Sequence, residues 1–385
     1  METPNPIDPA EFPVLNERIF FNHSAVTPLP ARAAHALRDY ADEAARMGSA
    51  AVGGWVERIA TIRRTAAGLL GADPSEIAFA HNTTHGLMCV ANSMRWRPGD
   101  NIVTAEHEFP ANVYVWRNLA RLGVALRTVP ERPDHRFRID DFIDRIDRRT
   151  RLLAISLVQY ATGYRMPVEA LAQVCRERGI RLCVDAIQAV GALPVDVAEL
   201  GCDFLSADGH KWMLGPEGAG LFYVGKDRFD ELTDAMTGWL GRPRFQDFAD
   251  TAQPAINEAR RFEEGALNVA GILALGQSLA LLREVGQAAI VGLIEERTAR
   301  LEAGLKALGF EIVSPRADGE RSGMIAAWKK DIDPYDLVAR LKRQRCDLSA
   351  RRGWLRFAPH FYTPLEQIDE VLERLDKLMK ASGKC

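Results

Sequence analysis

The chain has 385 residues, of which 47% are apolar and 26% charged, and its formal net charge is −3. This length exceeds what one hydrophobic core supports, so we expect two or three domains. The small net charge and the scattered basic residues argue against a nucleic-acid partner. No apolar run is long enough to span a bilayer, and the first residues lack the basic and apolar regions of a secretory signal, so we expect a cytoplasmic protein.

The cysteines and lysines constrain the chemistry of the chain. No two of its six cysteines form a Cys-x-x-Cys pair, so their spacing predicts neither a metal site nor a disulfide framework. They are Cys89, Cys175, Cys183, Cys202, Cys346 and Cys385. Arginine carries most of the positive charge, and the first lysine after Met1 is Lys211. Because only lysine offers an amine that can be unprotonated near neutral pH, Lys211 is a candidate nucleophile.

Apolar runs and helical patterns alternate between about residues 77 and 224. Predicted strands cover residues 102–105, 152–158, 182–184 and 221–224, and predicted helices cover 84–94, 111–122 and 168–178. This alternation predicts an α/β domain with a mostly parallel sheet and helices on both faces. Ligand sites in such sheets form where the strands end and the loops lead into helices.

The pattern changes after about residue 248. A long helical pattern covers about 270–308, and short β segments follow near 311–313, 324–328 and 355–357. We therefore expect an N-terminal segment, a large domain and a smaller α+β C-terminal domain. Their predicted limits are residues 1–20, 21–250 and 251–385.

Asp185 closes the apolar run at residues 182–184. A carboxylate at a strand end can simply cap the following loop. It can also point into the crevice at the sheet edge and pair with a cationic ring nitrogen. The position therefore predicts either a structural cap or a cofactor ligand.

Lys211 follows a further predicted strand at residues 202–205. Its neighbours His210 and Trp212, with a Gly-Pro turn just beyond, give it an apolar and tightly turned setting. Desolvation in such a setting lowers the pKa of a lysine and frees its amine for imine formation. Ser206 and His210 are natural phosphate donors close to this lysine.

Two other loops carry candidate ligands. Thr83 and Thr84 open an amphipathic helix, where they could be plain N-caps or could present hydroxyl and backbone N–H groups to a phosphate. Phe109 or His107 could stack on a flat ring, although a loop aromatic can equally pack into a core.

Together these segments resemble the class V aminotransferase family of pyridoxal 5'-phosphate (PLP) enzymes. The resemblance covers nearly the whole chain, from Phe-Phe-Asn-His-Ser at residues 20–24 to Leu-Arg-Phe-Ala-Pro-His at residues 355–360. Its most specific part is Val-Asp-Ala-Ile-Gln at 184–188 followed by Ser-Ala-Asp-Gly-His-Lys at 206–211. The family includes cysteine desulfurases, selenocysteine lyases, kynureninase and isopenicillin N epimerase-like proteins. The resemblance implies the type I fold of aspartate aminotransferase and a homodimer.

The resemblance also assigns roles to individual side chains. Lys211 would hold PLP as a Schiff base and move the α-proton of an amino-acid substrate. Around PLP, the implied ligands are Asp185 for the pyridine nitrogen, Gln188 for the phenolic oxygen, Phe109 for ring stacking, and Thr83 or Thr84, Ser206 and His210 for the phosphate. The implied substrate ligands are Arg356, which would bind the α-carboxylate, His23 and Tyr160.

The sequence departs from the family pattern at three places. Relatives often have an asparagine after the strand at 152–158, whereas residues 159–163 are Gln-Tyr-Ala-Thr-Gly, which is closer to the epimerase-like branch. Many relatives have Gly-Thr-x-Asn near the partner's phosphate, whereas residues 265–268 are Gly-Ala-Leu-Asn, so the hydroxyl is lost at Ala266. Desulfurases have a nucleophilic cysteine on the loop before the carboxylate-binding arginine, whereas residues 347–354 contain none. Cys346 lies just upstream, and we expect it to be a small buried hydrophobic residue.

The leading interpretation is transamination of an amino acid, with carbon–sulfur lyase or epimerase activity as alternatives. All three reactions begin with loss of the α-proton, and the sequence does not distinguish their later steps. A catalytically inactive binding protein on the same fold is a more distant alternative. A nucleotide-dependent oxidoreductase is disfavoured because no Gly-x-Gly-x-x-Gly motif comes after a predicted strand.

Overall fold

The computed structural model describes residues 8–381 and contains a seven-stranded sheet. The strand order is β2-β8-β7-β6-β5-β3-β4, and only β8 runs antiparallel to its neighbours. In this order the strands are Ile77–Ala80, Gly220–Val224, Phe204–Asp208, Arg181–Asp185, Thr150–Ser156, Asn101–Ala105 and Ala125–Val129. The predicted α/β class with a mostly parallel sheet is confirmed.

Helices cover both faces of this sheet because successive strand residues point to opposite sides. In β5, Leu152 packs into one hydrophobic cluster and Leu153 into another. The first cluster lies under α3 and α4, and the second lies under α2, α6 and α8. The helices of this part are α1 (Ala31–Met47), α2 (Val52–Leu70), α3 (Thr83–Ser93), α4 (Ala111–Arg117), α5 (Ile139–Ile143), α6 (Val168–Arg178), α7 (Val197–Leu200) and α8 (Val269–Val285).

The predicted helical stretch at 270–308 is two helices rather than one. Helix α8 ends at Val285, the next residue Gly286 has φ +85°, and α9 (Gln287–Ala307) continues at an angle of 84° to α8. Glycine adopts positive φ without steric cost, so the chain can turn here although the apolar pattern continues. Among residues 8–381, no single helix is both long and apolar enough to span a membrane; only the bent pair of α8 and α9 reaches that composition.

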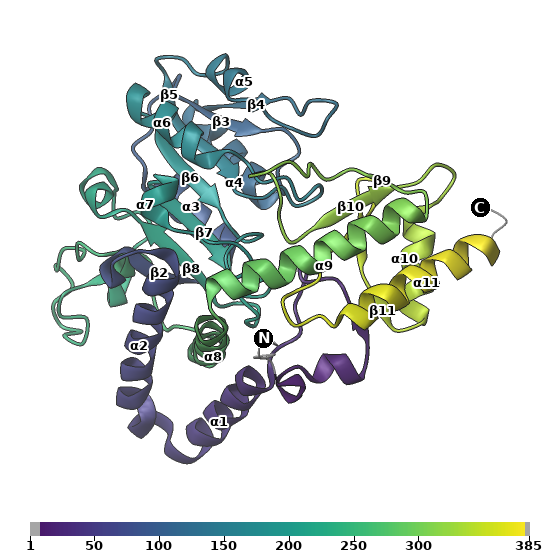
Figure 1. Cartoon of the computed structure of the whole chain (residues 1–385). Helices are drawn as coiled ribbons and strands as arrows, with labels where there is room; N and C mark the ends of the chain where they lie inside the picture. Colours follow the sequence, from purple (N-terminus) through teal and green to yellow (C-terminus); the bar gives the residue numbers. More distant parts are fainter. Residues whose placement is uncertain (1–7, 382–385) are drawn as a thin grey trace.

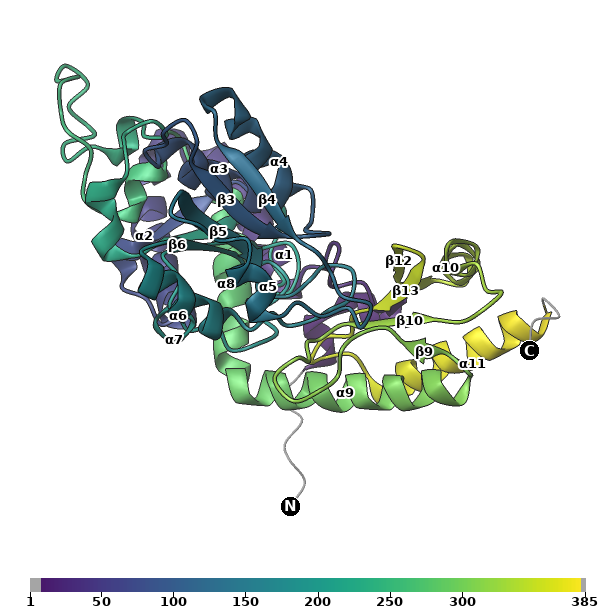
Figure 2. The same cartoon turned by 90° about the horizontal axis from the view of Figure 1, so that it is seen from above.

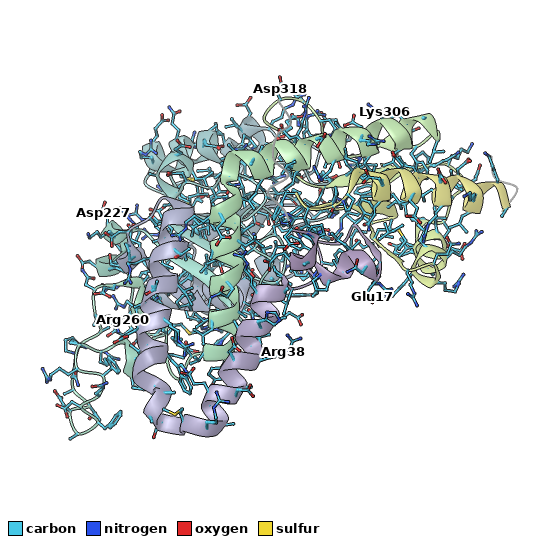
Figure 3. All side chains as sticks on the ribbon, turned by 60° about the horizontal axis from the view of Figure 1, so that its bottom comes forward. Glu17, Arg38, Asp227, Arg260, Lys306 and Asp318 are labelled. Carbon is cyan, nitrogen blue, oxygen red and sulfur yellow. The ribbon has the colours of Figure 1, made fainter. Side chains whose placement is uncertain are left out.

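A second, smaller sheet has the order β12-β13-β10-β9. Figure 2 shows it on the far side of the molecule from the large sheet, with α9 passing from one part to the other. Charged side chains such as Arg38 on α1 and Lys306 on α9 project outward (Figure 3). The elements of this part are β9 (Glu311–Ile312), β10 (Ile325–Trp328), α10 (Pro334–Arg343), β11 (Cys346–Asp347), β12 (Ser349–Arg351), β13 (Trp354–Phe357) and α11 (Leu365–Ala381).

The N-terminal segment packs with this C-terminal part. Strand β1 (Ile19–Phe20) pairs in parallel with β11, and Ile19 and Phe21 join the hydrophobic cluster of α9, α10 and α11. Helix α8, in contrast, lies against α1 and α2 beside the large sheet (Figure 1). The domain limits drawn from the sequence remain a prediction, and this packing favours a division at Gly286 over one at residue 250.

Candidate active site

The candidate site lies where neighbouring parallel strands of the large sheet end. Asp185 is the last residue of β6, Asp208 is the last residue of β7, and the loop with Glu108 follows β3. Since parallel strands present their carboxyl ends at one edge, these side chains gather there. Lys211 follows β7 by three residues and reaches the same edge.

Lys211 is a buried amine. The residue is 7% exposed, and burial lowers its pKa to about 8, while the negative charge of Asp185 opposes that change. A neutral amine is therefore available at mildly basic pH, which fits the nucleophilic role predicted for it. The positive charge of Arg356 lowers the pKa of Lys211 further.

Asp185 is a buried carboxylate whose pKa burial raises to about 6. Its Oδ1 accepts a hydrogen bond of 3.0 Å from the backbone N–H of Ile187. Among the described residues no cationic side chain lies within 4 Å of it, although Lys211 is close enough to stabilise its charge. A buried carboxylate without a contacting cation fits a ligand that brings a protonated ring nitrogen.

The side chains predicted to bind a phosphate lie around the start of α3. The Oγ1 of Thr83 accepts from the backbone N–H of Asp208, and the Oγ of Ser206 donates to the backbone oxygen of Thr83, both at 3.1 Å. These two hydroxyls therefore join β7 to α3. Thr84 is partly exposed at the first turn of α3, and Nδ1 of His210 lies 2.7 Å from Oδ2 of Asp208, which leaves Nε2 of His210 for another ligand.

Glycine at position 86 permits this junction. A Cβ atom there would lie 2.3 Å from the Oγ of Ser206, closer than van der Waals contact allows. The close approach keeps the first turn of α3, with its free N–H groups, against the end of β7. A helix N-terminus in this position favours an anion, which fits the phosphate of PLP.

Phe109 is the aromatic residue beside Lys211. The Nζ of Lys211 lies 5.5 Å from the centroid of the Phe109 ring, and Phe109 is 43% exposed as a residue. Tyr160 meets the same ring edge-on at 5.4 Å. His107 instead has φ +60° and lies 3.9 Å from the Glu106 carboxylate. Of the two alternatives for ring stacking, the structure favours Phe109.

Glu108 is a buried carboxylate that the sequence does not single out. Its oxygens accept hydrogen bonds from the backbone N–H of Ser156 at 2.8 Å, from the Ser156 hydroxyl, and from Nε2 of Gln159 at 3.0 Å. Burial raises its pKa to about 7, and the nearby charge of Asp185 raises it further. Glu108 thus ties the loop that carries Phe109 to the end of β5. The sequence feature that could have pointed to Glu108 is its position directly before Phe109, the predicted stacking residue.

Arg356 is 2% exposed and lies on β13. It donates from Nε to the Ser349 hydroxyl at 3.0 Å and from one terminal nitrogen to the Tyr160 backbone oxygen at 2.6 Å. Burial, reinforced by the charge of Arg351, lowers its pKa to about 9. Among residues 8–381 no carboxylate lies within 4 Å of it, so the salt bridge that would make it a structural residue is absent.

Arg351 lies on the same face of the small sheet as Arg356. Ser349 and Arg356 face each other across the β12–β13 ladder, and Arg351 is two residues further along β12. Side chains two residues apart on a strand share a face, so the two guanidinium groups lie on one side. Arg351 donates to the Ala350 backbone oxygen at 2.8 Å and has no carboxylate within 4 Å among the described residues.

The structure contradicts the role expected for His23. This side chain is fully buried; Nδ1 lies 2.7 Å from the Ala358 backbone oxygen and Nε2 lies 2.7 Å from the Tyr362 hydroxyl. Burial lowers its pKa to about 4, so the ring is neutral. With both nitrogens engaged, His23 joins the N-terminal segment to the C-terminal part and has no nitrogen left for a substrate.

Gln188 lies beside the lysine segment, although its amide already has partners. It donates from Nε2 to the Ser24 backbone oxygen, and its Oε1 accepts from Nε1 of Trp212, both at 3.0 Å. One proton of Nε2 stays free for an acceptor such as a phenolic oxygen. Its predicted role at the cofactor remains a prediction.

No cysteine of the described chain faces this site. Cys346 is 0% exposed on β11, and burial raises its pKa to about 12. The connection from β12 to β13 is a tight reversal at residues 352–353, too short to carry a mobile thiol. The structural role expected for Cys346 agrees with this placement, and Cys385 lies outside the described residues.

The chain resembles known proteins over nearly its whole length. A family model described as Aminotransferase class-V matches residues 19–355. A cysteine desulfurase of Klebsiella pneumoniae (strain 342) is 36% identical over 348 residues, covering 85% of this chain and 84% of that protein. Isopenicillin N epimerase of Streptomyces clavuligerus is 31% identical over 336 residues, covering 82% and 83%.

Solved structures show the same similarity. A complex between the cystine C–S lyase C-DES and its reaction product cysteine persulfide has a TM-score of 0.89 and 25% identity, covering 95% of this chain and 99% of that one. A mutant of C-DES with glycine covalently linked to its PLP cofactor has a TM-score of 0.90 and 25% identity, covering 96% and 99%.

Proposed function

The chain belongs to the class V aminotransferase family, and on that premise we propose that it is a carbon–sulfur lyase for a cystine-type amino acid. Family membership confirms three expectations from the sequence: the type I fold, PLP as the cofactor and an enzymatic activity. The homodimer and the cytoplasmic location remain predictions. Transamination is the leading expectation from the sequence, and the named relatives favour its alternative, carbon–sulfur cleavage.

The residues at the sheet edge fit PLP. Asp185 supplies a buried carboxylate for the ring nitrogen, Lys211 supplies an amine for covalent attachment, and Thr84 with the start of α3 supplies donors for the phosphate. When bound, PLP withdraws electrons from the substrate Cα and so acidifies its proton. Phe109, whose ring centroid lies 5.5 Å from the Lys211 amine, would cover the ring.

The remaining side chains bind and orient the substrate. Arg356 presents a forked guanidinium to the α-carboxylate, which fixes the direction of the Cα–H bond. The amine of Lys211 takes the proton from Cα, and the sulfur leaves Cβ with the bonding electrons. With one water, the three-carbon remainder yields pyruvate and ammonia, so a cystine substrate gives cysteine persulfide as the third product.

The single observation that carries the proposal is the absence of a thiol from the site among the described residues. A desulfurase passes sulfur to its own cysteine, whereas here Cys346 is buried on β11 and its pKa is raised to about 12. The sulfur must therefore leave on the small-molecule product. A persulfide product of this kind is what C-DES is described as releasing.

The test offers L-cystine, L-cysteine and L-alanine separately to the PLP-loaded enzyme, without any keto acid. We expect pyruvate and a trappable small-molecule persulfide in equal amounts from cystine, with no keto-acid requirement. A product that appears only when a keto acid is added would indicate transamination. Racemised substrate without pyruvate would indicate epimerisation, and a persulfide found on Cys346 would restore the desulfurase interpretation.

A further inference from the structure

A second cluster of polar side chains lies outside the site described above. His81 follows β2, His85 lies in the first turns of α3, and Glu264 lies on the loop before α8. One donor atom from each lies within 4.8 Å of the other two. Among residues 8–381, no other group of three histidine, cysteine or acidic side chains comes so close.

The glutamate lies between the two imidazoles. Nε2 of His81 is 3.0 Å from one Glu264 oxygen, and Nε2 of His85 is 3.6 Å from the other. The two imidazole rings are 4.9 Å apart between centroids. The side chains of His81 and Glu264 are half-exposed, at 50% and 43%, while His85 is 13% exposed. Within one chain, His85 is therefore the anchored member of the cluster, and His81 and Glu264 are the more exposed members.

We propose that His81, His85 and Glu264 bind a divalent transition metal of the zinc class. Zinc takes imidazole nitrogen and carboxylate oxygen at about 2.0–2.2 Å in tetrahedral geometry, which separates neighbouring ligand atoms by roughly 3.3 Å. The two imidazole nitrogens lie 3.0 and 3.6 Å from different oxygens of Glu264, and one donor atom from each of the three side chains lies within 4.8 Å of the others, so a small side-chain adjustment would bring them to that spacing. Two imidazole nitrogens with one carboxylate suit Zn²⁺ better than Mg²⁺ or Ca²⁺, which prefer oxygen ligands.

One hydrogen bond changes when the metal binds. Nδ1 of His85 accepts from the backbone N–H of His81 at 3.5 Å, which places the ring proton on Nε2. Ligation through Nε2 moves that proton to Nδ1, so this long contact is given up. Nε2 of His85 lies 3.8 Å from Sγ of Cys89 and 3.6 Å from a Glu264 oxygen, and zinc would replace the proton on this nitrogen.

The site would stabilise the phosphate-binding turn. Thr83 and Thr84 lie between the two histidines in sequence, at the start of α3. A metal bound by His81, His85 and Glu264 joins that turn to the loop before α8, which otherwise meet through imidazole–carboxylate contacts. We expect it to slow PLP loss and raise thermal stability without taking part in carbon–sulfur cleavage. This departs from the sequence-based expectation that the chain has no metal.

The test titrates Zn²⁺ by calorimetry into tag-free, PLP-loaded protein that has been freed of metal on a chelating resin. We expect one zinc per chain, a raised melting temperature, and no heat from Mg²⁺. His85→Ala should weaken zinc binding by about tenfold or more. His135→Ala is the matched control, because His135 pairs with Glu131 at 2.5 Å without a second imidazole.

Absence of saturable zinc binding would overturn the proposal, as would equal affinity in His85→Ala and wild type. If His85→Ala does not fold, as judged by circular dichroism, Glu264→Gln replaces it, since the Glu264 side chain is half-exposed. Anomalous diffraction at the zinc edge should then place the ion between the three side chains, and an ion found elsewhere would refute this assignment.

Discussion

The active site has a cofactor side at the edge of the large sheet and a substrate side on the small sheet. The cofactor side has more acidic than basic side chains, and the substrate side has more basic than acidic ones. At the edge of the large sheet, Asp185 and Glu108 are buried carboxyl groups that interact with each other, and Asp185 also interacts with the amine of Lys211. On the small sheet, Arg351 and Arg356 share one face with no carboxylate within 4 Å among residues 8–381. The acidic side chains suit a cationic cofactor ring, and the two arginines suit an anionic substrate.

Burial moves the pKa values on both sides toward the neutral forms. It raises the pKa of Asp185 to about 6 and lowers that of Arg356 to about 9. Such shifts show that each buried charge lacks a full complement of partners in the protein alone. Each side is therefore built to be completed by a ligand group of opposite charge.

Removing the amine from the cofactor side should have the largest effect. Lys211→Ala should lose covalent PLP attachment and reduce turnover by about 10³-fold or more, because it removes both the attachment point and the proton acceptor. Borohydride reduction followed by peptide mass analysis should label Lys211 in the wild type. Lys226→Ala, at an exposed lysine, is the control. Label on any other lysine in the wild type would contradict the assignment.

Removing the buried cation from the substrate side should leave PLP bound. Arg356→Ala should lower kcat/KM about 10- to 100-fold, since a charge-assisted hydrogen-bonded pair contributes roughly 1.5–3 kcal/mol. Arg356→Lys should recover part of this, because an ammonium lacks the fork. Steady-state kinetics with an amino acid and its decarboxylated amine provide the measurement. Equal losses for both substrates would show that Arg356 does not bind the carboxylate.

Substitution of Arg351 tests whether the substrate side also binds the distal carboxylate of cystine. Arg351→Gln should lower kcat/KM for cystine about fivefold to tenfold and leave cysteine nearly unchanged, because only cystine has a distal carboxylate. The neighbouring Arg352→Gln is the matched control, since Arg352 already pairs with Glu131. If Arg351→Gln slows both substrates equally, this arginine serves the site as a whole and does not select the substrate.

The pH dependence of PLP attachment tests the lowered pKa of Lys211 in the wild-type protein. Burial lowers the pKa of Lys211 to about 8, so its nucleophilic neutral form predominates above pH 8 and declines below it. The rate of covalent attachment to apoprotein should fall about tenfold per pH unit below 8 and level off above it. Absorbance of the attached cofactor in stopped-flow mixing provides the rate. A rate that keeps rising to pH 10 would indicate an ordinary, solvated lysine.

The smallest effect on activity is expected at Cys346, which belongs to neither side. Cys346→Ala should keep turnover within about twofold and cost on the order of 1 kcal/mol of unfolding free energy, because a buried sulfur is lost from a packed strand. Thermal unfolding and cystine turnover measure the two effects. Loss of turnover with unchanged stability would return a catalytic role to this thiol.

Local features of this protein can be predicted from its sequence alone. Strand–helix alternation predicts the mostly parallel sheet, and helix α6 has the predicted limits, Val168–Arg178. Asp185 and Lys211 can be identified because each lies just after an apolar run, and strand ends in a parallel sheet meet at one edge. The lack of a cysteine before Arg356 is also evident from the sequence.

Contacts between distant residues depend on the tertiary structure. His23 is engaged by Ala358 and Tyr362, 335 and 339 residues away in the chain, which no local pattern reveals. Glu108 likewise accepts hydrogen bonds from Ser156 and Gln159, at and just after the end of β5. Arg351 and Arg356 share a face only because β12 pairs with β13. The sequence predicts one helix over about 270–308 and misses the break at Gly286. The helical spacing of apolar residues continues past this glycine, and the packing of the two helices against different parts of the protein decides that the chain turns there. Burial and charge pairing arise from the whole fold, so the sequence alone does not yield the pKa values and free hydrogen-bonding groups of the site.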